Sequence, residues 1–326
     1  MQPLNSFNPG HAGPEPFGSS KHQVLFIVNP AAGANRAQQR WLCFKSRLQE
    51  SGIHFDEALT RGPGHAAELA RRATTEYDVL AAVGGDGTVA EIAGAIVTTP
   101  GSRATLMVVP FGTGNDLAQV LEIRSEADIL SVLTRGLTTW VDLIEITCRQ
   151  NQKNVVQYAS LFAGAGIIAE SLKKTTATCK RIFGQRLAYP VGLLRALLAC
   201  PSTHLSVAFD QEVLDQDFLF VGACNTEIAG GGMRIAPGAS IGDGVLNLNL
   251  IGAMSRWAAL WQLLRLYRGK HTLHPNARYV AARTLRIDAP EPIEIAADGD
   301  LIGHTPARIA IKPNCLRVLT PKMKAR

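Results

Sequence analysis

The sequence predicts an α/β N-terminal domain, with a parallel sheet and helices on both faces, followed by a mostly antiparallel β-sandwich domain. Three observations lead to this fold class. Apolar, strand-like runs alternate with helical patterns between residues 22 and 146, as in a parallel sheet with helical crossovers. Short alternating strands with few helices dominate residues 147–312. Two glycine-rich turns each follow an apolar run and lead into a helical pattern.

Hydrophobic spacing predicts the N-terminal elements. Ala37, Trp41, Phe44 and Leu48 recur at helical spacing, and Gly52 follows the end of that helix. A capping box formed by Ser125 and Asp128 is expected to begin the last helix of this domain. The expected strands are 23–28, 53–59, 79–83, 106–109 and 138–146, and the expected helices begin near residues 36, 66, 86, 116 and 126.

The C-terminal domain is predicted to hold seven short strands and two helical insertions. The strands are expected at 155–161, 204–209, 218–223, 245–251, 279–287, 293–296 and 307–311. The helical stripes consist of Leu187, Val191, Leu194 and Leu198, and of Trp257, Leu260, Leu264 and Tyr267. Both stripes are interpreted mainly as core-packing faces. The alternative places Trp257 and Trp261, flanked by Arg256, Arg265 and Arg268, at a lipid interface.

Composition narrows the class of partners. The chain has 326 residues, of which 46% are hydrophobic, and this is enough for two cores. A net charge of +6 favours an anionic surface as a partner. The positive charge is scattered along the sequence, and no nucleic-acid-binding motif is present. We therefore expect contact with an anionic membrane surface and a nucleotide, and no binding of nucleic acid.

The location of the protein is predicted from its cysteines and its apolar stretches. Six widely spaced cysteines without a C-x-x-C pair favour free thiols in a reducing compartment. Residues 1–21 are rich in proline and glycine and are expected to be a disordered leader. The longest apolar stretch, 187–199, contains Pro190 and Arg195 and falls short of the roughly 20 residues that span a bilayer. A cytoplasmic, peripherally membrane-associated protein is expected, and a homodimer is left open.

The two glycine-rich turns predict a phosphate site. They comprise residues 84–88 and 110–116, and they differ from both the P-loop and the dinucleotide fingerprint. Glycine allows backbone N–H groups to approach a phosphate closely at the start of a helix. Asp86, Asn115 and Asp116 stand at these helix starts.

These turns carry a family resemblance. The segments GGDGTVAEIAGAI and PFGTGNDLAQVL resemble the diacylglycerol kinase catalytic domain family, in particular soluble bacterial lipid kinases related to sphingosine and ceramide kinases. The resemblance implies an NAD kinase/diacylglycerol kinase-like fold and an ATP-dependent lipid kinase with Mg²⁺. Further segments similar to the family pattern are Val28–Gly33, Thr60 with Gly64–Ala66, Trp140–Leu143, Asn225–Pro237, Gly242–Leu246 and Ala297–Asp300.

The resemblance implies a set of nucleotide and metal residues. Asp86, Asp116 and Asp142 are expected to hold Mg²⁺, largely through waters, because Mg²⁺ dehydrates reluctantly. Asp243, with Ser240 and Val245, resembles a structural cation site, and its alternative is an ordinary Asp-Gly turn before a strand. The residues expected to contact ATP are Asn29, Pro30, Ala31, Ala32, Gly33, Thr60, Gly84, Gly85, Asp86, Gly87, Thr88, Val89, Ala90, Thr113, Asn115 and Asp116.

Asp298 and Asp300 are the candidate acid-base pair. In an extended segment they point to the same side, so one is expected to act as general base on the lipid hydroxyl and the other to orient it. Asp300 stands where the family has glutamate and is one methylene shorter, which predicts a retuned or reduced activity. The chain end, 313–326, is a candidate addition to the N-terminal domain.

Three functions remain open from the sequence. The first is an ATP-dependent kinase acting on a lipid hydroxyl, either diacylglycerol-like or sphingoid. The second is a nucleotide kinase of the NAD kinase type, against which the GTGND and GGG-IAP segments argue. The third is a regulatory protein that binds nucleotide or lipid and has lost its base at Asp300.

Overall fold

The computed structural model describes residues 23–174, 192–197, 202–266 and 268–322. The expected leader, most of the expected helical stripe at 187–198, and Tyr267 lie outside these described residues.

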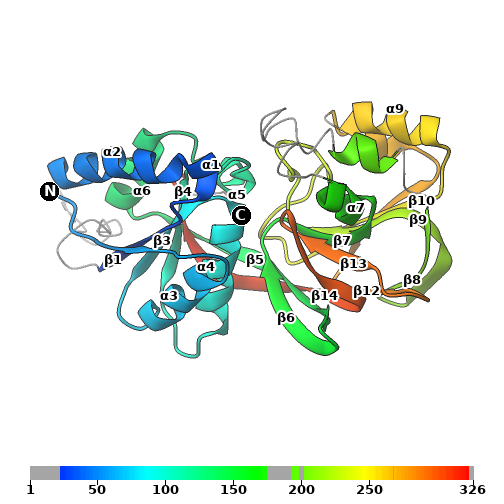
Figure 1. Ribbon diagram of the computed structural model, residues 1–326, viewed down its shortest axis with the longest axis horizontal. Coiled ribbons are helices and arrows are strands. Elements are labelled where there is room, and N and C mark those ends of the chain that lie inside the picture. Colours follow the sequence, from blue (N-terminus) through cyan, green and yellow to red (C-terminus); the bar gives the residue numbers. More distant parts are fainter. Residues whose placement is uncertain (1–22, 175–191, 198–201, 267, 323–326) are drawn as a thin grey trace, which may run out of the picture.

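The N-terminal half is a parallel sheet with the strand order β2-β1-β3-β4 (Figure 1). Every residue of β1 and β3 is buried, as expected for strands that helices cover on both faces. Figure 1 shows α2 and α6 on one side of this sheet and α3 and α4 on the other. The elements are β1 Val24–Val28, α1 Ala32–Asn35, α2 Ala37–Glu50, β2 Asp56–Leu59, α3 His65–Ala73, β3 Val79–Gly84, α4 Asp86–Thr98, β4 Thr105–Pro110, α5 Asp116–Val120 and α6 Glu126–Arg135.

The C-terminal half is β-rich, as predicted, and its strands pair antiparallel with one another. A core of mainly aliphatic side chains lies within it, and a second core fills the N-terminal half and extends into the C-terminal half, for example to Phe162 and Ile235. Its strands are β5 Thr138–Gln150, β6 Lys153–Ala159, β7 Phe162–Gly166, β8 Thr203–Phe209, β9 Glu212–Cys224, β10 Leu246–Gly252, β11 Ala277–Ala282, β12 Thr284–Asp288, β13 Glu294–Ala297 and β14 Asp300–Leu319. Its helices are α7 Ile167–Lys174, α9 Arg256–Leu266 and the 3-10 helix η1 Lys270–Leu273, and residues 192–197 are also helical.

Two long strands join the halves. β5 and β14 pair antiparallel from one half into the other, and Val318 of β14 then pairs parallel with Leu106 of β4 (Figure 1). The end of β14 therefore continues the N-terminal sheet.

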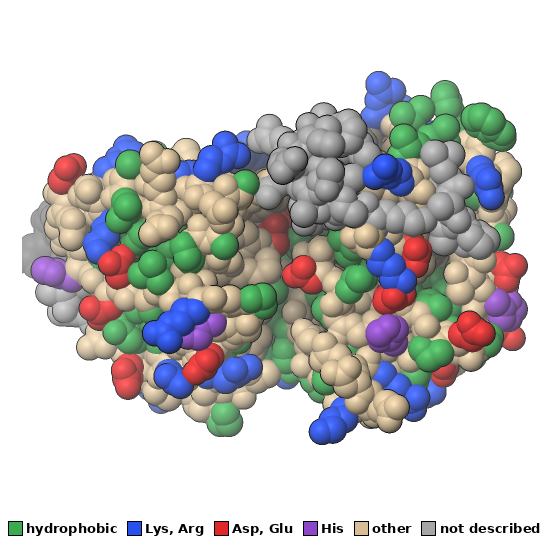
Figure 2. Space-filling model, viewed as in Figure 1, with side chains coloured by type: hydrophobic (Ala, Val, Ile, Leu, Met, Phe, Trp, Pro, Cys, Tyr) green, Lys and Arg blue, Asp and Glu red, His purple; other side chains and the backbone are tan. Residues whose placement is uncertain are grey.

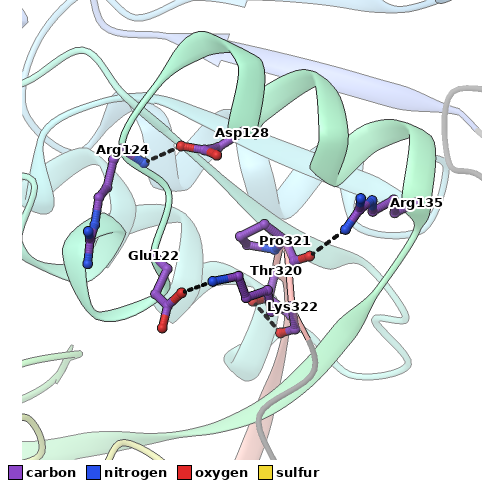
Figure 3. A network of polar contacts seen from close by, with 7 residues as sticks. All are labelled: Glu122, Arg124, Asp128, Arg135, Thr320, Pro321 and Lys322. Carbon is purple, nitrogen blue, oxygen red and sulfur yellow. Dashed lines mark hydrogen bonds and ion pairs between the residues drawn. The ribbon is translucent and has the colours of Figure 1, made fainter.

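Polar contacts hold residues 320–322 in place beside α6 (Figure 3). Lys322 pairs with Glu122, with 2.9 Å between Nζ and Oε2, and Arg135 donates to the Pro321 carbonyl. The expected capping box of Ser125 and Asp128 is present at the start of α6.

Two expectations from hydrophobic spacing were wrong. The single strand expected at 279–287 is divided, because β11 pairs with β10 whereas β12 pairs with β8 and β14. The stripe containing Trp257 and Leu264 does not pack into the core. The exposed fractions of these two side chains are 81% and 63%, and Ala259 is the buried residue of α9.

Candidate active site

Two glycine-rich loops meet at one edge of the N-terminal sheet. They follow β3 and β4, which are neighbouring parallel strands, so both loops leave the sheet at its carboxyl edge. The Gly112 N–H donates to the Gly84 carbonyl across 2.7 Å. A Cβ on Gly112 would lie 2.2 Å from the Gly85 Cα, so a side chain at this position would clash with the first loop.

Two asparagine side chains brace the loops after β4 and β1. Asn115 donates to the Gly112 carbonyl across 3.0 Å and so braces the second loop. Asn29, which follows β1, donates to Thr88 Oγ1 and accepts from the Ala31 N–H. The three loops after β1, β3 and β4 thus form one polar surface.

Asp86 and Asp116 place two carboxylates beside each other on this surface. Asp86 Oδ1 accepts from the Leu117 N–H across 3.3 Å. Burial, reinforced by the charge of Asp116, raises the pKa of Asp86 to about 6. A cation near this pair would offset both effects, and carboxylate oxygens are ligands that Mg²⁺ prefers.

Asp116 also connects the two halves of the molecule. Its Oδ2 accepts from the Gly231 N–H across 2.9 Å. Burial raises the pKa of Asp116, and the backbone N–H groups of Gly231, Gly230 and Gly232 oppose that rise. Gly230, Gly231 and Gly232 have φ values of 67°, 85° and 95°, and this left-handed backbone turns N–H groups toward the carboxylate.

Asp298 and Asp300 approach from the C-terminal half. The expectation of an extended Asp298 was wrong: it has φ 45° and Gly299 has φ 94°, so the two residues form the hairpin turn between β13 and β14. Asp300 follows the turn, and its Oδ2 lies 3.3 Å from the position that a Cβ on Gly87 would occupy. Asp300 therefore stands directly against the first glycine loop.

The Asp298 carboxylate is bound by backbone. It accepts from the N–H groups of Ser160, Leu161 and Phe162 at 2.6, 3.0 and 3.0 Å. Burial raises the pKa of Asp298 to about 7 although these three hydrogen bonds lower it. With its oxygens occupied in this way, Asp298 orders the turn that presents Asp300.

The loops and aspartates line one cavity of about 420 Å³, within the usual range of small-molecule sites. Among the residues predicted from sequence, those that line it are Asn29, Ala31, Ala32, Gly33, Gly85, Asp86, Gly87, Thr88, Thr113, Asp116, Asp298 and Asp300. Those that do not line it are Pro30, Thr60, Gly84, Val89, Ala90, Asn115, Asp142, Ser240, Asp243 and Val245.

Asp142, the third member of the expected acidic cluster, does not line the cavity with Asp86 and Asp116. It is fully buried, and its two oxygens accept from the N–H groups of Gly244 and Asn314 at 2.7 and 2.6 Å. Asp142 thus lies at the junction of β5 with two loops, and its expected role at the metal stays a prediction. One of these loops contains Asp243, whose Oδ1 accepts from the Val245 N–H.

In the described part of the chain, side chains could not hold a metal ion without the help of waters. No group of three or more His, Cys, Asp or Glu side chains is arranged there to hold a metal ion. The pair Asp86 and Asp116 fits an ion that keeps most of its waters, as Mg²⁺ commonly does.

Sequence reasoning missed two surfaces next to the cavity. An apolar groove shares Ile168, Leu193 and Ile235 with it. On the other side, a groove of about 1130 Å³ shares Gly33 and residues 112–114 with the cavity and is lined by Arg36, Arg40 and Arg124. Apolar side chains at helical spacing and isolated arginines look the same in sequence whether they line a site or not.

Comparisons with known proteins agree on one family. The family described as "Diacylglycerol kinase catalytic domain" matches residues 23–146, and the "YegS C-terminal NAD kinase beta sandwich-like domain" matches residues 162–320. A diacylglycerol kinase of Staphylococcus aureus strain RF122 / ET3-1 is 29% identical over 306 residues, covering 92% of this chain and 93% of its own. The diacylglycerol kinase of Bacillus subtilis strain 168 is 26% identical over 311 residues, covering 93% and 98%.

Solved structures share the fold. A Bacillus anthracis structure superposes with a TM-score of 0.77 at 22% identity, covering 92% of this chain and 95% of its own. A second one, described as a diacylglycerol kinase from the same organism, gives a TM-score of 0.68 at 21% identity, with coverages of 92% and 97%. At this identity the likeness concerns the two-domain architecture.

Proposed function

Because the chain belongs to the diacylglycerol kinase catalytic domain family, we propose that it is an ATP-dependent lipid kinase. It transfers the γ-phosphoryl group of ATP to a hydroxyl group of a membrane lipid that is diacylglycerol-like or sphingoid. One observation carries the proposal: three polar loops and four aspartates from both halves line a single cavity.

The N-terminal loops bind the phosphates in this proposal. Residues 31–33, 85–88 and 112–114 line the cavity, and the start of α4 there also favours negative charge. Asp86 and Asp116 would hold Mg²⁺ through waters, and the ion supplies positive charge against the developing charge of the transferred group. The three-arginine groove beside these loops adds positive potential for a polyanion.

The C-terminal turn supplies the base. Asp300 takes the proton of the lipid hydroxyl as that oxygen bonds to the γ-phosphorus and the bond from phosphorus to ADP breaks. Asp298 is a positioning residue, because its carboxylate holds the 160–162 backbone and the turn in a fixed relation. The shorter Asp300 reaches the hydroxyl because β14 brings it against Gly87.

The protein works at a membrane surface in the cytoplasm, where ATP and its lipid acceptor meet. No helix among the described residues is long and apolar enough to cross a bilayer. We propose a peripheral attachment, driven in part by the net charge of +6.

One assay tests the proposal. The full chain is incubated with γ-labelled ATP, Mg²⁺ and, in parallel, diacylglycerol, ceramide, a sphingoid base and NAD. Label on a lipid hydroxyl supports the kinase. Label on NAD would favour a nucleotide kinase, and ATP binding without transfer to any acceptor would favour a regulatory protein.

A further inference from the structure

One face of α9 exposes large apolar side chains. Trp257, Trp261 and Leu264 have exposed fractions of 81%, 62% and 63%. Their spacing of four and three residues places them on one side of the helix. Figure 2 shows green hydrophobic side chains gathered over α9 at the upper right, with basic side chains beside them. Tryptophan is favoured at membrane interfaces, where its ring is partly in lipid and its N–H is in water.

The opposite face of α9 lines the apolar groove. Ala259, Leu263 and Leu266 contribute to this groove together with Leu193 and Ile168. The last two of these residues also line the active-site cavity. One helix therefore separates the exposed apolar surface from a groove that continues to the site of phosphoryl transfer.

The net positive charge of the chain comes from the sequence segment that contains this helix. Residues 244–287 contain seven lysines and arginines and no aspartate or glutamate, whereas the rest of the chain has 26 basic and 27 acidic residues. The net charge of +6 thus comes from this segment. At about 100° per residue, Arg256 and Arg265 lie on opposite sides of the apolar stripe.

Five of these seven basic side chains make no ion pair with any described residue, and four of the five lie on α9 or just after it. Arg278 and Arg286 pair with Glu212 and Asp288. Arg256, Arg265, Arg268 and Lys270 make no ion pair with any residue in the described ranges. Positive charge around an exposed apolar stripe complements an anionic bilayer surface.

We propose that α9 is the surface by which this protein docks on an anionic lipid bilayer. Trp257, Trp261 and Leu264 enter the boundary between headgroups and acyl chains, and the surrounding arginines contact anionic headgroups. The docked helix then places the mouth of the apolar groove at the membrane. This last step rests on the proposed lipid kinase function, whereas the docking itself does not.

Vesicle binding tests the apolar stripe. The full chain is sedimented with phosphatidylcholine vesicles, with and without phosphatidylglycerol. We expect the wild type to bind the anionic vesicles with a blue shift of its tryptophan emission. The variant Trp257→Ser/Trp261→Ser should bind them about tenfold more weakly, or more weakly still. Trp140→Ser is the matched control, since Trp140 is 49% exposed but lies on β5. Wild-type affinity in the double variant would overturn the proposal.

A second pair of variants tests the charge. Arg256→Gln/Arg268→Gln should weaken binding to anionic vesicles and flatten its dependence on salt. Salt shortens the screening length from about 10 Å at 0.1 M to about 3 Å at 1 M. Arg71→Gln/Arg72→Gln on α3 removes the same charge elsewhere and should bind as the wild type does. If both double variants lost the same amount of vesicle affinity, the effect would be one of net charge, and a role specific to α9 would be overturned.

Two further readouts separate this proposal from others. Vesicle binding is measured without ATP, so it does not depend on kinase activity. If the chain docks on these vesicles but transfers no phosphate to any acceptor in the kinase assay, the proposed function fails and the docking stands. The ratio of turnover on vesicle-borne lipid to turnover on a short-chain soluble lipid should fall in Trp257→Ser/Trp261→Ser. If the wild type is a dimer, and this variant is a monomer that still binds vesicles, α9 is a contact between copies and the docking proposal fails.

Discussion

At the scale of single residues, the site depends on carboxylates that are costly to keep charged. Asp86 lies beside Asp116 in a cavity wall, and its pKa is raised to about 6 from 3.8. The folded chain therefore holds this proton more tightly than the unfolded chain does. Stability from this residue is greatest at low pH and is lost as the pH rises from about 4 to about 6.

The substitution Asp86→Asn should abolish kinase activity and leave the fold intact. The amide keeps the size of the side chain but removes the charge that we propose serves Mg²⁺. In metal-free buffer the variant should gain stability relative to the wild type as the pH rises from about 4 to about 7, because only the wild type carries the disfavoured charge. Urea unfolding at several pH values and a standard kinase assay measure both effects. Unchanged turnover would remove Asp86 from the mechanism.

Substitutions should show that Asp298 and Asp300 have different roles. Both Asp298→Asn and Asp300→Asn are expected to lower turnover by roughly 10²-fold or more, the usual scale of a general acid-base contribution. Only Asp298→Asn should also lower the free energy of unfolding, by about 1–3 kcal/mol, because its amide group would face backbone donors. ATP affinity should survive in both variants.

The conservative change Asp300→Glu is the control for this pair. It restores the side-chain length of the family and should keep or raise turnover. Suppose instead that the wild type binds ATP but transfers no phosphate, and that Asp300→Glu switches transfer on. The natural chain would then be a regulatory protein and not a kinase.

At the scale of secondary-structure elements, local spacing predicted position better than orientation. The helix α2 was predictable because Trp41, Phe44 and Leu48 all pack into one core. The same kind of spacing in α9 shows that one face is apolar, but it does not show whether that face packs inward. In α9 Ala259, Leu263 and Leu266 face inward. Trp257, Trp261 and Leu264 face outward.

Long-range pairing was the part that sequence could not supply. The 20-residue strand β14 pairs with β5, β12, β13 and β4, and no local pattern encodes that set of partners. For the same reason Asp142 was assigned to the metal cluster. It follows the glycine loops in sequence, but β5 carries it to a junction where Gly244 and Asn314 use both of its oxygens.

Asp142→Asn should therefore affect stability and not metal use. One of its two backbone hydrogen bonds would be lost, at a cost of about 1–3 kcal/mol in the free energy of unfolding. Activity per folded molecule should keep its Mg²⁺ dependence, whereas Asp116→Asn should need more Mg²⁺. Urea unfolding and a Mg²⁺ titration of turnover measure the two effects. If Asp142→Asn shifted the Mg²⁺ titration of turnover and left the free energy of unfolding unchanged, Asp142 would belong to the metal site.

At the scale of the whole molecule, the cavity exists only where the two halves meet. The N-terminal half supplies the loops around Asp86, and the C-terminal half supplies Asp298 and Asp300. β5 and β14 join the halves through continuous strands, and the Gly231 to Asp116 hydrogen bond adds a contact at the cavity itself. The relative placement of phosphate and base thus depends on contacts between the halves.

The substitution Gly231→Ala tests that contact. Gly231 has φ 85°, and a Cβ there would meet nothing within 4 Å, so the substitution costs backbone strain of about 1–2 kcal/mol and causes no clash. Gly101, in the turn before β4, has φ 76° and equally open surroundings, so Gly101→Ala should lower the free energy of unfolding by a similar amount. Only Gly231→Ala should also lower kinase turnover, because strain relief moves the N–H that binds Asp116. Urea unfolding compares the strain in the two variants, and steady-state kinetics compares their turnover. If both kept equal activity, the hydrogen bond between Gly231 and Asp116 would play no part in aligning the two halves for transfer.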